Sequence, residues 1–75
     1  MSTELVREAT RDGRRVALQR CYDDPQEGTT VVEAEIQPAT GTAVSRGYRF
    51  STAPEAFRFV QEALLALQYL GCNVA

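Results

Sequence analysis

The chain has 75 residues and a mass of 8.3 kDa, which allows one domain, residues 1–75, and leaves no room for a second hydrophobic core. Hydrophobic residues make up 44% and charged residues 24%, proportions that are typical of a folded globular protein and not of a disordered or fibrous one. The sequence contains no His, which removes the commonest general base, the commonest metal ligand and every Ser-His or Cys-His nucleophile pair. We therefore expect a protein that is not an enzyme and that has no catalytic residues, cofactor or metal.

The first segment, residues 3–11, is predicted to be a β-strand because the dipeptide Asp12-Gly13 that follows it is a strong hairpin signal. If this turn carries a glycine bulge, Val6 faces Leu18 and Glu4 faces Arg20, which pairs apolar with apolar and acid with base. A short helix is the alternative, because apolar residues in this segment also fit helical spacing.

Three further strands are predicted from apolar residues that alternate along the chain, at residues 14–22, 29–37 and 43–51. The clearest is 29–37, where Val32, Ala34 and Ile36 alternate with polar residues. In 43–51, Val44, Tyr48 and Phe50 share one side with Arg46, and Gly47 suggests a bulge. In 14–22, one face carries Val16, Leu18, Arg20 and Tyr22, and the other carries Ala17, Gln19 and Cys21.

The segments between these strands have the composition of turns. Residues 23–28 combine Asp, Pro and Gly, and residues 37–41 contain Pro38 and Gly41. Because both links are short, they predict that neighbouring strands pair in antiparallel fashion.

A helix is predicted over residues 53–70. Thr52-Ala53-Pro54-Glu55 has the pattern of a capping box, and an apolar stripe with helical spacing follows it. Gly71 is predicted to end the helix in a Schellman motif with Cys72 as its hydrophobic follow-up. Residues 73–75 are predicted to be a short tail.

Together these elements predict an α+β fold, in which a four-stranded antiparallel β-meander is followed by one C-terminal α-helix on a single face. In its layout alone, this order resembles small dimeric single-strand-binding coactivator domains and several phage-encoded inhibitors. With a helix at residues 3–11, the layout would resemble double-stranded-RNA-binding domains. The stretch from Ser51 to Ala56 lacks the basic cluster that those domains place at the start of their last helix.

Localisation follows from two further features of the sequence. The N-terminal residues have no basic and apolar leader pattern, and no apolar run is long enough to cross a membrane. Cys21 and Cys72 lie far apart, without a second pair or a His, so we expect free thiols in a reducing cytoplasm.

Two charged surfaces are candidates for binding. The basic candidate, for anions or nucleic acid, consists of arginines that lie near the strand aromatics: Arg7, Arg11, Arg14, Arg15, Arg46 and Arg49. The acidic candidate would dock a basic partner and consists of Asp23, Asp24, Glu27, Glu33 and Glu35. The simpler explanation in both cases is a solvated polar face.

The third candidate surface is apolar. The apolar arc of the predicted helix is wider than one small sheet can cover, and Leu65 and Tyr69 form an i,i+4 pair on its polar side. We expect a homodimer with a contact formed by Phe59, Leu65, Ala66 and Tyr69, because small domains often gain burial by association.

The sequence therefore predicts a small cytoplasmic interaction module that acts through protein–protein contacts and does not enter membranes. The alternative is a single-stranded nucleic-acid-binding domain that uses its arginines and strand aromatics.

Overall fold

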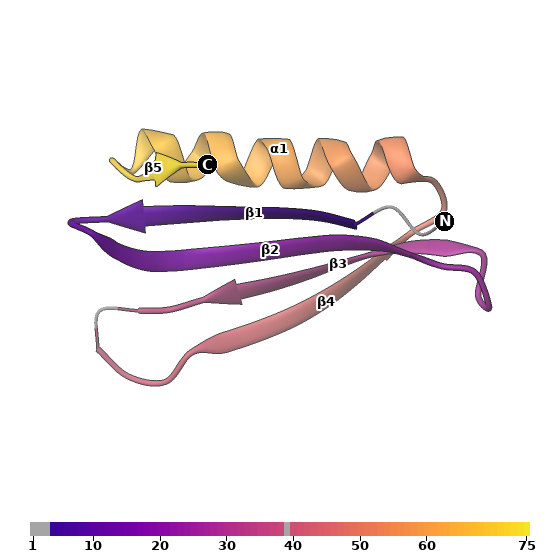
Figure 1. The fold of residues 1–75 in the computed structure, drawn as a ribbon, viewed down its shortest axis with the longest axis horizontal. Coiled ribbons are helices and arrows are strands. Elements are labelled where there is room, and N and C mark those ends of the chain that lie inside the picture. Colours follow the sequence, from indigo (N-terminus) through magenta and orange to yellow (C-terminus); the bar gives the residue numbers. More distant parts are fainter. Residues whose placement is uncertain (1–3, 39) are drawn as a thin grey trace.

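A computed structural model, which describes residues 4–38 and 40–75, shows an antiparallel sheet with one helix on it (Figure 1). The elements in chain order are β1 (Glu4–Arg11), β2 (Arg14–Asp24), β3 (Thr29–Ile36), β4 (Val44–Phe50), α1 (Ala53–Tyr69) and β5 (Asn73–Val74). The predicted α+β fold is confirmed, and the first segment is a strand. Two predicted positions, Thr3 in the first strand and Ala39 in the second turn, lie outside the described residues.

The strands follow one another across the sheet in the order β4-β3-β2-β1-β5. The sequence left open the order of the short tail predicted after the helix, and the structure shows that Asn73 and Val74 pair with Thr10 and Ala9 of β1. The Ala75 amide continues this pairing by donating to the Glu8 carbonyl over 2.9 Å. The tail therefore lies along the β1 edge of the sheet as a short fifth strand.

The β1–β2 hairpin closes through a two-residue turn in which both Asp12 and Gly13 have positive φ, 53° and 76°. This is the backbone pattern of a type I′ turn, whose twist matches that of the flanking strands. Further along, Ala9 pairs with Ala17 while Thr10 pairs with Arg15. Val16 is therefore an extra residue on β2, a β-bulge.

The position of this bulge changes the register that the sequence predicts. Val6 pairs with Arg20 and not with Leu18, and Glu4 pairs with Tyr22. The predicted ion pair nevertheless forms on a diagonal, with the Arg20 guanidinium 3.1 Å from the Glu4 carboxylate. The prediction placed the bulge at the turn glycine, whereas the turn is a regular two-residue one and the extra residue lies in β2.

The β3–β4 pairing runs without a break from Thr30 and Phe50 to Ile36 and Val44. Gly47 pairs with Glu33 in the middle of this run, so the bulge suggested at Gly47 is wrong. Gly47 therefore lies within β4 as a regularly paired strand residue.

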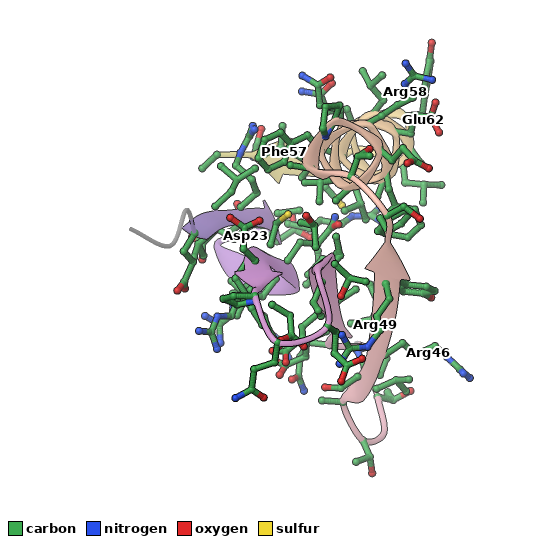
Figure 2. The ribbon with its side chains drawn as sticks, turned by 90° about the vertical axis from the view of Figure 1, so that its right-hand side faces the viewer. Asp23, Arg46, Arg49, Phe57, Arg58 and Glu62 are labelled. Carbon is green, nitrogen blue, oxygen red and sulfur yellow. The ribbon has the colours of Figure 1, made fainter. Side chains whose placement is uncertain are left out.

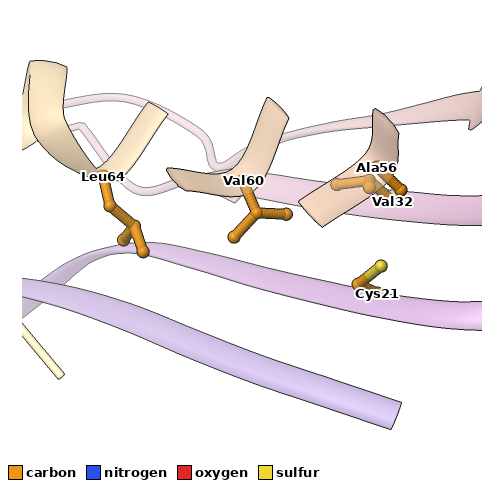
Figure 3. Packing of buried hydrophobic residues seen from close by; sticks show 5 residues of the cluster. All are labelled: Cys21, Val32, Ala56, Val60 and Leu64. Atoms are coloured by element: carbon orange, nitrogen blue, oxygen red, sulfur yellow. The ribbon is translucent and has the colours of Figure 1, made fainter. Parts of the chain in front are cut away.

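The hydrophobic core lies between α1 and one face of the sheet (Figure 3). Cys21 and Val32 contribute from paired positions on β2 and β3, and Ala56, Val60 and Leu64 contribute from the helix at i, i+4 and i+8. Side chains alternate between the two faces of a strand, so the face of β2 with Ala17, Gln19 and Cys21 is the one that α1 covers. We call this the helix side of the sheet and the other the open side.

The two ends of α1 follow the sequence signals to different degrees. Gly71, with φ of 89°, donates to the Gln68 carbonyl and Cys72 donates to the Leu67 carbonyl, which are the two bonds of the predicted Schellman motif. Thr52 is the N-cap residue as predicted, but its hydroxyl donates to the Glu55 carboxylate over 2.8 Å and makes no cap bond to the backbone. The predicted capping-box hydrogen bonds to the backbone are therefore wrong, because the Thr52 and Glu55 side chains bond to each other instead.

Candidate interaction surfaces

The six arginines of the basic candidate are spread over several parts of the fold. Arg46 and Arg49 leave β4 on opposite sides (Figure 2), because they are three residues apart in a strand. Arg7 lies on β1, where its Nε donates to the Ala75 carbonyl over 2.6 Å. Only Arg11, Arg14 and Arg15 come together, at the β1–β2 hairpin. The structure therefore replaces one predicted basic patch with a smaller one.

Two of the arginines that point to the open side are engaged with acids. Arg49 donates to Asp24 over 2.9 Å and to the Thr29 hydroxyl over 3.0 Å, so it braces β4 across β3 to β2. The Arg49 guanidinium lowers the pKa of the Asp24 carboxyl below its ordinary value. Arg20 is held by Glu4. On the open side, positive charge is therefore largely neutralised within the molecule.

The acidic candidate is also divided. Asp24 belongs to the ion pair with Arg49, and Glu33 accepts a hydrogen bond from the Tyr22 hydroxyl over 2.7 Å, which raises the pKa of Tyr22. Asp23 lies on the helix side and accepts from the Thr30 hydroxyl. Glu27 is exposed in the β2–β3 turn, and Glu33 and Glu35 share the open side of β3. These five carboxylates therefore do not form one continuous face.

The strand aromatics are used within the fold. The Phe59 ring of α1 lies 4.8 Å from the Tyr48 ring and 5.3 Å from the Phe50 ring, measured between centroids, in tilted geometry. Tyr22 is bonded to Glu33 on the open side. A sheet that stacks unpaired bases needs aromatic faces that are open to solvent. The aromatic part of the single-strand-binding alternative therefore has little support from this arrangement.

The helix leaves part of its own side of the sheet uncovered. Ile36 and Val44 are a cross-strand pair on the helix side, and they are 46% and 50% exposed. Tyr48, on the same side of β4, is 37% exposed despite its contact with Phe59. Because β4 is the last strand of the described sheet, this apolar area reaches the free edge.

The exposed surface of α1 continues this area. Ala66 and Leu70 follow Phe59 at i+7 and i+11 and therefore share its flank. Leu70 is 66% exposed. Leu65 and Tyr69, the other predicted contact residues, are 54% and 89% exposed on the outer surface of the helix, away from the sheet. We define the β4-side surface as the residues on the uncovered sheet and on the adjoining helix flank: Ile36, Val44, Tyr48, Phe59, Ala66 and Leu70.

The described residues offer no arrangement that is typical of a catalytic or metal centre. Within this part of the chain, no three His, Cys, Asp or Glu side chains are placed to share a metal ion. Cys21 is 1% exposed, and burial raises the pKa of its thiol, so it contributes to packing as a protonated group. Cys72 is half-buried, and both thiols are free.

Comparison with known proteins gives no relative: no family model, curated protein or solved structure matches the chain. The part of the chain that the structure describes contains one helix, α1, and it does not have the length and apolar character to cross a membrane.

Proposed function

We propose that this protein is a small cytoplasmic binding module that forms a homodimer through its β4-side surface. The observation that carries the proposal is the pair Ile36 and Val44, two large apolar side chains left about half exposed on the side of the sheet that forms the core. An apolar area at the free edge of a sheet is typical of an interface. The two free thiols support a reducing compartment.

The size of the exposed surface supports a second copy as the occupant. The chain exposes 5359 Å², whereas a folded monomer of this mass is expected to expose about 4,600 Å². Its radius of gyration is 12.8 Å, compared with about 11 Å expected for this length. The excess is several hundred Å², the same order as the ~800 Å² that each partner buries in a standard interface. Formation of a dimer would reduce the accessible surface of each chain to about the area expected for a protein of this mass.

The edge strand itself favours pairing with its own copy. β4 has seven residues, no proline and an unbroken register with β3, so its outer backbone groups are available to another strand. A two-fold axis through Gly47 would pair β4 with itself in antiparallel fashion and set Arg46 opposite Tyr48 of the second copy, a favourable cation–π arrangement. A register with Arg46 on the axis would oppose two guanidinium groups, which disfavours it.

The test is the mass in solution, measured by sedimentation at micromolar concentration. We expect the wild type to sediment at about twice 8.3 kDa and Val44→Lys to sediment as a folded monomer. Val6→Lys is the matched control, because Val6 is a strand valine that is 51% exposed on the open side, and it should remain dimeric.

A second variant separates the two apolar areas. Leu65→Glu with Tyr69→Glu should also remain dimeric, because both residues lie on the outer surface of α1, outside the proposed contact. If this double variant were monomeric and Val44→Lys remained dimeric, the dimer contact would lie on the outer surface of α1 and not on the β4-side surface. A monomeric wild type would contradict the homodimer.

A further inference from the structure

The β1–β2 hairpin ends in three arginines. Arg11 and Arg14 flank the turn and are directly paired across the two strands, and Arg15 pairs with Thr10 next to them. All three are exposed. With Asp12 in the turn, this tip carries a net charge of +2 on a protein whose net charge is −2. We call Arg11, Arg14 and Arg15 the hairpin arginines.

The Val16 bulge decides where these side chains point. By alternation from Ala17, Arg15 would lie on the helix side, but the extra residue moves it to the open side, near Glu8. Arg14 then shares the helix side with Arg11. The two-residue turn makes Arg11 and Arg14 partners on one side of the hairpin, and the bulge lets Ala9 and Ala17 lie on that same helix side.

The pairing of Arg11 with Arg14 is unfavourable in the isolated protein. Like charges directly opposite each other across an antiparallel pair are destabilising. Over residues 4–38 and 40–75, the ion pairs within 4.0 Å are Arg15 with Glu8, Arg20 with Glu4, and Arg49 with Asp24. Neither Arg11 nor Arg14 is in one of them. An anion bound between Arg11 and Arg14 would attract both guanidinium groups and offset their mutual repulsion.

The shape of the tip points to the kind of anion. The hairpin forms one end of the long axis of the molecule, beyond the end of α1 (Figure 1). A hollow of about 370 Å³ lies at its base, lined by Arg11, Asp12, Arg14, Arg15, Val16 and Gln37. A projecting two-stranded ribbon fits the wide major groove of B-form DNA but not the deep, narrow one of an RNA duplex, and guanidinium groups bind phosphate oxygens with two parallel hydrogen bonds. The turn residues Asp12 and Gly13 provide no apolar side chain to enter a membrane.

We propose that the β1–β2 hairpin binds the phosphate backbone of double-stranded DNA through the hairpin arginines. This site is distinct from the β4-side surface and does not depend on the homodimer. Its contacts are electrostatic, so the binding is independent of base sequence and weakens as salt rises. The site also differs from the single-strand alternative, since it uses no aromatic side chain.

The experiment is fluorescence anisotropy with a labelled 20-base-pair DNA duplex and the full chain, over a series of salt concentrations. With three phosphates neutralised for each copy, the slope of log K against log salt should be about −3 for one bound chain, and about twice that if both copies of a dimer engage. Arg11→Gln with Arg14→Gln should weaken binding at least tenfold and reduce this slope.

Arg20→Gln with Arg58→Gln is the matched control. It makes the same change in net charge at two exposed arginines outside both proposed contacts, one on the open side of β2 and one on α1. Binding that falls only in the hairpin variant supports the site. An equal fall in both variants would overturn it in favour of a general charge effect. Absence of binding at low salt, or binding to anionic lipid vesicles but not to the duplex, would also overturn it. The mass of each variant in solution, measured alongside, keeps a loss of the dimer separate from a loss of DNA binding.

Discussion

At the β1 edge of the sheet, Asn73 and Val74 pair with Thr10 and Ala9, whereas β4 is the outermost strand at the opposite edge. Near β1, the chain returns from the helix through Gly71 and covers the sheet with its own residues. Near β4, the helix leaves Ile36 and Val44 about half exposed. One short segment covers the β1 edge, and no other described segment pairs with the outer side of β4, which leaves the apolar pair at that edge open to solvent.

The largest loss of stability should come from a change in the core that α1 covers. Leu64→Ala should lower the free energy of unfolding by about 2–5 kcal/mol, because Leu64 is 5% exposed in the core and its removal leaves a cavity. The control is Leu65→Ala, one position along the same helix and 54% exposed, which should change stability by less than about 0.5 kcal/mol. Urea denaturation measures both. Similar losses in the two variants would contradict the placement of α1.

A smaller loss of stability should come from a change at Gly71, in the turn that leads from α1 to β5. Gly71→Ala should cost about 1–2 kcal/mol, because φ of 89° is unfavourable for alanine even though a Cβ there meets no atom within 4 Å. Amide exchange at Ala75 should speed up with it. Gly47→Ala is the control in β4, also with free space around a Cβ but without a positive φ, and it should be neutral or stabilising. Equal destabilisation by both would show that backbone conformation is not the cause.

The smallest effect concerns the brace that holds β4 to the rest of the sheet. Arg49 lowers the pKa of Asp24, so their pair stabilises the fold above the ordinary carboxyl pKa, and this contribution disappears as pH falls through the lowered value. Arg49→Gln should return the pKa of Asp24 toward its ordinary value, as followed by NMR titration. Its stability deficit should be present at neutral pH and vanish in acid. A deficit that persists unchanged in acid would indicate lost packing.

The helix and the strands were predictable because their signals are local. The apolar stripe that includes Val60 and Leu64 and the glycine at position 71 fix the helix and its end, and alternation fixes β3. The β1–β2 register was not predictable in this way, since the position of an extra residue depends on the twist and packing of the finished sheet. β5 has only two residues, too few for a periodic pattern to identify.

The six arginines of the basic candidate do not lie together, for a reason that the sequence already contains. Arg46 and Arg49 are an odd number of positions apart, and in a strand such residues point to opposite sides. The same reasoning would have found the hairpin arginines, because residues that flank a two-residue turn must pair with each other. The exposure of Ile36 and Val44 could not be obtained from alternation, since it depends on where the helix lies across the sheet.

The contact between the first and last strands also has a kinetic consequence. The meander forms from strands that are adjacent in sequence, whereas Arg7 and Ala75, which meet at the β1 edge, are 68 positions apart. Contacts of high sequence separation pay the largest loop-closure entropy and form late in folding. The first strand can therefore join a hairpin early but gains its outer neighbour only after the helix has docked. Among the described elements, we expect β5 to be the last to form and the first to open.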